Sequence, residues 1–146
     1  MLFRSTSAAT GVQRRVAPLL SRLAPTLGVL TLDAETISRD PAVVRDYRAD
    51  PLNHNGKVRA RTGTEMMLTA AAMPQRLRSL TLPLFVLHGS ADRLVPTAAS
   101  EMVTAHAGST DLTRTVYPGL FHEPHNEPEK EQVLDDVVAW LDAHRG

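Results

Sequence analysis

Residues 82–125 read LPLFVLHGSADRLVPTAASEMVTAHAGSTDLTRTVYPGLFHEPH, and this stretch decides the fold. It begins with a short apolar run, residues 82–87, which is typical of a strand buried on both faces of a parallel sheet. Residues 97–107 suit a helix that stops at a glycine, and residues 112–117 alternate as a second strand does. The stretch therefore predicts a strand, a crossover helix and a second, parallel strand.

The two loops that follow these strands carry the candidate functional residues. A right-handed crossover brings the carboxyl ends of both strands to one edge of the sheet, where functional groups of open parallel sheets collect. Asp92 lies in the first loop and His122 in the second. We therefore expect the Asp92 carboxylate to bond the His122 imidazole, although Asp92 could also cap a turn beside an exposed histidine. Glu123 and Glu127 are the other candidate partners of His122.

Three segments resemble a known family. HGSADRLVP (88–96) and YPGLFHEPHNEPE (117–129), followed by an amphipathic terminal helix, resemble the C-terminal half of α/β-hydrolase fold serine hydrolases. The resemblance is to monoacylglycerol lipases and lysophospholipases, which are serine aminopeptidase-like hydrolases. Upstream, ISRDPAVVRDYRADPLNHNGKV (37–58) is similar to their cap region. The resemblance implies that Asp92 is the acid and His122 the base of a catalytic triad.

The same resemblance implies an activity. It indicates an ester hydrolase that acts on lipid-like carboxylic esters, either a monoacylglycerol or a lysophospholipid, by acyl transfer through a serine. No cofactor is implied. We expect a cytoplasmic location, with peripheral association with a membrane as an alternative.

The nucleophile is missing from the sequence. None of the serines has glycine two residues before and two residues after it, as the G-x-S-x-G elbow of this fold requires. By the resemblance, the chain begins after the point at which the nucleophile occurs. We expect no turnover by the chain alone. The competing interpretation is a non-catalytic truncated product or binding module that at most complements a separately encoded N-terminal half.

Composition excludes several other classes. The 16 basic and 16 acidic residues cancel, so net charge gives no indication of a nucleic-acid partner. Cysteine is absent, which excludes disulfides and thiol chemistry. No apolar run reaches the roughly 18 residues of a transmembrane helix. His122 and His125 are too close for the zinc-protease pattern, and Pro124 between them opposes a helix.

We divide the chain into a cap or lid segment, residues 1–80, and the C-terminal part of the hydrolase core, residues 81–146. Residues 1–5 are too few to assign, and a strand stump is one interpretation of them. In the rest of the cap segment we expect short helices and loops. These are two helical pieces within 12–30, a helix that starts at Pro41 with Asp40 as its N-cap, a loop over 52–62, and a helix over 64–80 interrupted at Pro74.

Three methionines in the cap segment admit two interpretations. Met66, Met67 and Met73 could line an acyl-chain pocket, because methionine adapts to irregular apolar ligands. Alternatively, the helical spacing of Met66 and Met73 with neighbouring apolar residues is that of ordinary core. The spacing alone favours ordinary core, and the family resemblance makes the two interpretations about equal.

Overall fold

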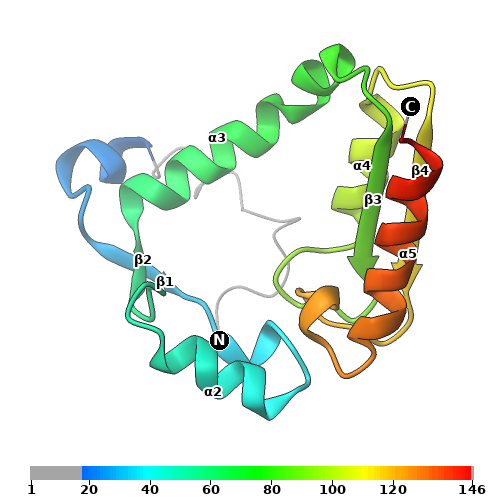
Figure 1. Cartoon of the computed structure of the whole chain (residues 1–146). Coiled ribbons are helices and arrows are strands. Elements are labelled where there is room, and N and C mark those ends of the chain that lie inside the picture. Colours follow the sequence, from blue (N-terminus) through cyan, green and yellow to red (C-terminus); the bar gives the residue numbers. More distant parts are fainter. Residues whose placement is uncertain (1–17, 146) are drawn as a thin grey trace.

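The computed structural model describes residues 18–145, whose elements form two groups connected by the long helix α3 (Figure 1). The expected strand stump at residues 1–5 lies outside the described residues. In chain order the elements are β1 (Gly28–Thr31), η2 (Ala34–Thr36), α2 (Pro41–Ala49), β2 (Lys57–Arg59), α3 (Ala60–Arg76), η3 (Leu77–Ser79), β3 (Leu84–Gly89), α4 (Ala98–His106), β4 (Leu112–Tyr117), η4 (Pro124–Asn126) and α5 (Lys130–Ala143).

The core segment is the predicted parallel unit. Strands β3 and β4 pair in parallel along their whole length, from Leu84 opposite Leu112 to Gly89 opposite Tyr117. Helices α4 and α5 flank this strand pair (Figure 1), and Phe85 of β3 stacks on Trp140 of α5 with 5.9 Å between ring centroids. The expected α/β architecture, with a βαβ unit followed by a terminal helix, is confirmed. Both loops that carry candidate residues leave the sheet at the carboxyl ends of these strands.

A small apolar cluster holds α5 against the end of β4. Tyr117, Leu120 and Val133 are buried together, and Leu87 packs on them. The Tyr117 hydroxyl donates to Oδ2 of Asp136 at 2.8 Å, which connects the last residue of β4 to α5. Burial, together with this carboxylate, raises the pKa of the Tyr117 phenol above its ordinary value. The cluster lies directly before the His122 loop.

We expect the Tyr117→Phe variant to lose about 1 kcal/mol of unfolding free energy at neutral pH, because the Asp136 carboxylate loses its donor. The pKa of Tyr117 is higher in the folded than in the unfolded chain, so its contribution is complete below about pH 10 and decreases above that pH. The difference between wild type and variant should therefore shrink as pH rises from 8 to 11. Urea unfolding across this range measures it, and a difference that grows with pH would contradict the assignment.

The cap segment contains an antiparallel strand pair that the sequence analysis did not predict. Strands β1 and β2 pair antiparallel, with Leu30 opposite Val58. The helical pieces expected within 12–30 are therefore wrong at residues 28–30, where β1 lies, and the loop expected over 52–62 is wrong at 57–62, where β2 and the start of α3 lie. Each strand obtains its backbone hydrogen-bond partners from the other strand, which is distant in the sequence. Neither segment taken alone therefore carries a pattern that predicts a strand.

The helices of the cap segment follow the sequence more closely. Helix α2 starts at Pro41, and the Asp40 carboxylate accepts a hydrogen bond from Ala42 N–H at 2.8 Å, which confirms the predicted cap. Helix α3 begins at Ala60 and runs through Pro74, so the interruption expected there is wrong. Pro74 has no N–H to bond the carbonyl of Ala70 four residues earlier, and because Pro74 lies in the last turn the helix ends soon after this single lost bond. Within residues 18–145, no helix combines the length and apolarity needed to cross a membrane.

Candidate active site

The Asp92 carboxylate is fixed by its own loop. Its Oδ1 accepts hydrogen bonds from Leu94 N–H at 2.7 Å and from Val95 N–H at 3.0 Å. The Asp92 side chain is only 3% exposed. Two backbone donors stabilise the charged form of a carboxylate that has lost most of its water. The second oxygen, Oδ2, is left to face the neighbouring loop.

His122 meets that second oxygen. Its Nδ1 lies 2.8 Å from Asp92 Oδ2, and its side chain is 37% exposed. An ionised carboxylate is an acceptor only, so Nδ1 of the neutral imidazole carries the proton and Nε2 carries the lone pair. The predicted hydrogen bond is present, and it leaves a base nitrogen that is not bonded to Asp92.

A second imidazole borders the same carboxylate. His88 Nε2 lies 3.0 Å from the carbonyl oxygen of Val95 and 3.4 Å from Asp92 Oδ2, and the side chain is 10% exposed. Donation to Val95 braces the turn whose N–H groups hold Asp92. The sequence analysis did not assign this support of the Asp92 turn to His88.

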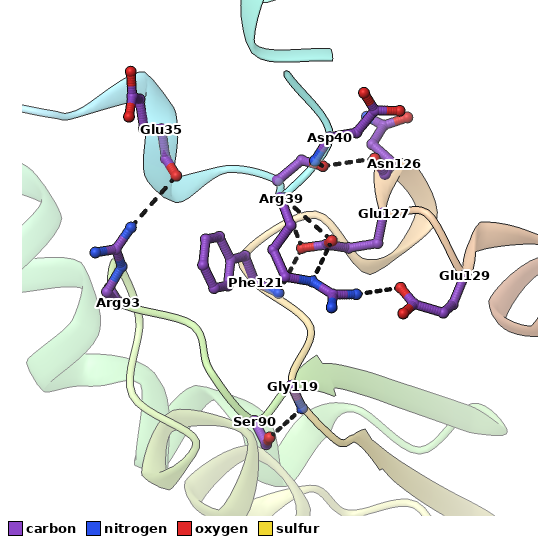
Figure 2. Close-up of polar contacts among 11 residues, drawn as sticks. Glu35, Arg39, Asp40, Ser90, Arg93, Gly119, Phe121, Asn126, Glu127 and Glu129 are labelled. Atoms are coloured by element: carbon purple, nitrogen blue, oxygen red, sulfur yellow. Dashed lines mark hydrogen bonds and ion pairs between the residues drawn. The ribbon is translucent and has the colours of Figure 1, made fainter. Parts of the chain in front are cut away.

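The two loops approach each other at backbone distance. Ser90 N–H donates to Tyr117 O and Ala91 N–H donates to Leu120 O, each at 2.9 Å. Gly119 N–H donates to Ser90 Oγ at 2.8 Å (Figure 2). Gly119 has a φ of +77°, a backbone conformation that residues other than glycine rarely adopt. These bonds hold the start of the histidine loop, the segment 118–129 between β4 and α5, against the Asp92 loop, the segment 90–97 between β3 and α4.

The acidic residues of the histidine loop have other partners. Glu127 accepts hydrogen bonds from Phe121 N–H at 2.7 Å and from Arg39 Nε at 2.9 Å (Figure 2), and Glu123 accepts one from the side chain of Asn126 at 2.8 Å. Glu127 and Glu123, considered as alternatives to Asp92, are therefore not the partners of His122. Burial lowers the pKa of the Arg39 guanidinium, but the bond and charge of Glu127 outweigh it, and the pKa is raised.

Arg93 and Phe121 line a hollow beside the histidine loop. The guanidinium carbon of Arg93 lies 5.0 Å from the centroid of the Phe121 ring, and Arg93 is exposed to solvent. The hollow has a volume of about 510 Å³ and lies next to helix α2. It is lined by Glu35, Ser38, Arg39, Pro41, Val44, Arg45, Arg48, Arg93 and Phe121. Phe121 precedes His122 in the chain, but neither His122 nor Asp92 is part of this lining.

A separate hollow of about 660 Å³ runs along α3. It is lined by Arg61, Thr62, Glu65, Met66, Thr69, Ala70 and Met73. Met66 and Met73, two of the three candidate acyl-pocket residues, therefore share one surface, and Met67 is not part of that lining. Across residues 18–145, no three His, Cys, Asp or Glu side chains gather as a metal centre would require.

Comparisons with known proteins identify the family. Residues 2–129 match the model of the hydrolase family described as serine aminopeptidase, S33. The chain belongs to this family. It is 47% identical over 129 residues to a monoacylglycerol lipase of Mycolicibacterium smegmatis, an alignment that covers 88% of this chain and 46% of the lipase. It is 28% identical to the monoglyceride lipase of Rattus norvegicus, covering 99% of this chain and 48% of that enzyme.

Solved structures agree with the sequence relatives. The crystal structure of a Paleococcus ferrophilus monoacylglycerol lipase superposes with a TM-score of 0.81 at 26% identity, covering 93% of this chain and 53% of that one. This chain thus spans about half the length of the curated relatives it matches. The resemblance to monoacylglycerol lipases inferred from the sequence motifs is confirmed.

Proposed function

We propose that this chain supplies the acid, Asp92, and the base, His122, of a serine triad that hydrolyses lipid-like carboxylic esters, with a monoacylglycerol as the preferred substrate. The observation that carries the proposal is the 2.8 Å contact between His122 Nδ1 and an Asp92 carboxylate whose other oxygen is held by two backbone N–H groups. The names of the lipase relatives support the substrate class. The division into a cap segment, residues 1–80, and a core segment, residues 81–146, is part of this proposal.

The proposed chemistry is acyl transfer. A serine hydroxyl attacks the ester carbonyl, and His122 Nε2 takes its proton while Asp92 stabilises the imidazolium through Nδ1. The same imidazolium then protonates the departing alcohol, here glycerol, and the acyl group remains on the serine. Water, deprotonated by His122, then attacks the acyl carbonyl, and the serine oxygen leaves with the proton that His122 returns to it, which releases the fatty acid. The serine itself would come from the part of the enzyme that the sequence of this chain does not include.

A chimera tests the proposal. The part of the Mycolicibacterium smegmatis lipase that this chain does not cover would be fused to it, and fatty-acid release from a monoacylglycerol and from lysophosphatidylcholine would be measured. We expect the chimera to hydrolyse the monoacylglycerol and to react with a fluorophosphonate probe, whereas the 146-residue chain alone does neither. Probe labelling of the chain alone would contradict the assignment of the nucleophile to the other part. A folded chimera without turnover would contradict the proposed activity.

The alternative of a non-catalytic or complementing half is favoured by one observation. Leu134, Val138 and Leu141 form an exposed apolar stripe on α5, and Leu82 before β3 is also exposed. Apolar surface and sheet edges of this kind are normally covered. We infer that the missing part of the hydrolase covers this surface, whether it is fused to the chain or separately encoded.

We therefore expect the chain alone to self-associate and the chimera to be monomeric. Light scattering after size-exclusion chromatography measures both. Replacing Leu134 and Val138 by serine should reduce self-association of the chain, while the same changes at the charged positions Asp135 and Asp142 should not. A monodisperse monomer with a cooperative melt would instead favour an independent binding module.

A further inference from the structure

Glu127 is a buried carboxylate that the proposed mechanism does not use. Among the described residues, Glu127 and Val133 are the largest side chains that are fully buried. A carboxylate at such a position is stable only when its oxygens are hydrogen-bonded. Arg39 N–H approaches Oε1 at 3.3 Å and Oε2 at 3.2 Å, Arg39 Nε donates to Oε2 at 2.9 Å, and Phe121 N–H donates to Oε1 at 2.7 Å. Both oxygens of the Glu127 carboxylate are therefore hydrogen-bonded.

These contacts join two segments that are far apart in the sequence. Phe121 is the residue immediately before His122, and Arg39 lies just before helix α2 of the cap segment. Two further bonds run in parallel: Ser38 Oγ donates to Asn126 O, and Glu123 N–H donates to Ile37 O, each at 2.8 Å. Figure 2 shows the carboxylate of Glu127 placed between Arg39 and the histidine loop. The start of α2 and the histidine loop are therefore held as one body.

We propose that Glu127 is the positioning residue for His122: by binding Phe121 N–H and Arg39 together, it sets the histidine loop against the cap segment and keeps Nδ1 in contact with Asp92. The proposal rests on the proposed function, since it gives His122 the role of base. Productive geometry is sensitive, because a misplacement of about 1 Å can lower the rate about 100-fold. A shift of the cap segment would be transmitted to His122 through the same carboxylate.

The chain offers a matched pair of variants. Glu127→Gln keeps the shape of the side chain and one carbonyl oxygen, but its amide group would face the Arg39 guanidinium, donor against donor. Glu129 also bonds Arg39, but it is 48% exposed and its bond to Arg39 does not reach the histidine loop. Glu129→Gln is therefore the control. Both variants remove one negative charge near Arg39, and only the first disturbs the residue next to His122.

The test reads the Nδ1–H proton of His122 directly. In the ¹H NMR spectrum of the chain, an imidazole proton bonded to a carboxylate resonates far downfield, and His122→Gln assigns the signal by removing it. We expect the signal to persist in Glu129→Gln and to broaden or disappear in Glu127→Gln, with backbone spectra showing that both remain folded. An unchanged signal in folded Glu127→Gln overturns the proposal.

A second variant covers the case in which Glu127→Gln does not fold. Arg39→Lys keeps the positive charge but loses the guanidinium Nε–H that bonds Glu127 Oε2, so the His122 signal should broaden in this variant, and an unchanged signal overturns the proposal. In the active chimera, Glu127→Gln should lower kcat about 10- to 100-fold with little change in KM. Because the NMR signal needs no turnover, a chimera without activity would count against the proposed function and leave the positioning role to be judged by the signal.

Discussion

Replacing Asp92 by asparagine in the chimera is expected to lower kcat for monoacylglycerol hydrolysis about 10⁴-fold. The geometry dictates how the new side chain sits. Leu94 N–H and Val95 N–H both donate to Oδ1, so the amide carbonyl of asparagine must occupy that position. Its NH₂ group then takes the place of Oδ2 and donates to His122 Nδ1. The imidazole proton is forced onto Nε2, and the nitrogen that should accept the serine proton is blocked.

The chain contains a control for this variant. Asp111 Oδ2 lies 3.0 Å from His144 Nε2, which makes a second aspartate–histidine pair at the opposite end of β4 from the His122 loop. Asp111→Asn removes the same charge from a similar pair and should leave kcat within about twofold of wild type, because no reacting atom is near it. A His122→Ala chimera should lose at least as much activity as Asp92→Asn. Wild-type kcat in Asp92→Asn, or an equal loss in Asp111→Asn, would refute the acid–base assignment.

The Asp92–His122 contact was accessible from the sequence because it follows from topology. Two strands joined by a crossover helix must end at the same edge of the sheet, so the loops after Leu87 and Tyr117 had to be neighbours. Local patterns sufficed to find both strands and α4. The family resemblance then selected Asp92 over Glu123 and Glu127, a choice that spacing alone left open.

Features that depend on distant partners were not accessible. Glu127 was considered only as a partner for His122, because its true partner, Arg39, is 88 residues away in the sequence. The antiparallel pair of β1 and β2 was also missed, because neither strand is long enough to show a two-residue period. His144, just after α5, stacks its ring on Trp140 with 4.0 Å between centroids, a contact that the sequence analysis did not identify. Hydrophobic periodicity does not encode pairs of this kind.

Gly89 makes the second large prediction. A Cβ atom at this position would lie 2.1 Å from Phe121 O and 2.3 Å from Leu120 O. Both obstacles are backbone atoms of the histidine loop, so no side-chain rotation can relieve the clash. We expect Gly89→Ala to destabilise the chain by about 1–3 kcal/mol or more, as overpacking does. The loop must move away from the Asp92 turn, so the Nδ1–H signal of His122 should also disappear.

Gly63 provides the contrasting substitution, because only one atom, Val29 Cγ2 at 3.9 Å, lies within 4 Å of its added Cβ. Gly63 lies inside α3, where alanine is favoured over glycine by about 1 kcal/mol. Gly63→Ala should therefore raise the urea midpoint while Gly89→Ala lowers it, and the His122 signal should survive only in the former. If Gly89→Ala unfolded at the wild-type midpoint with the signal intact, the close approach of the two loops would not be what holds His122 against Asp92. Opposite responses of the two glycines would instead locate that dependence at the end of β3, where the absence of one methyl group lets His122 reach Asp92.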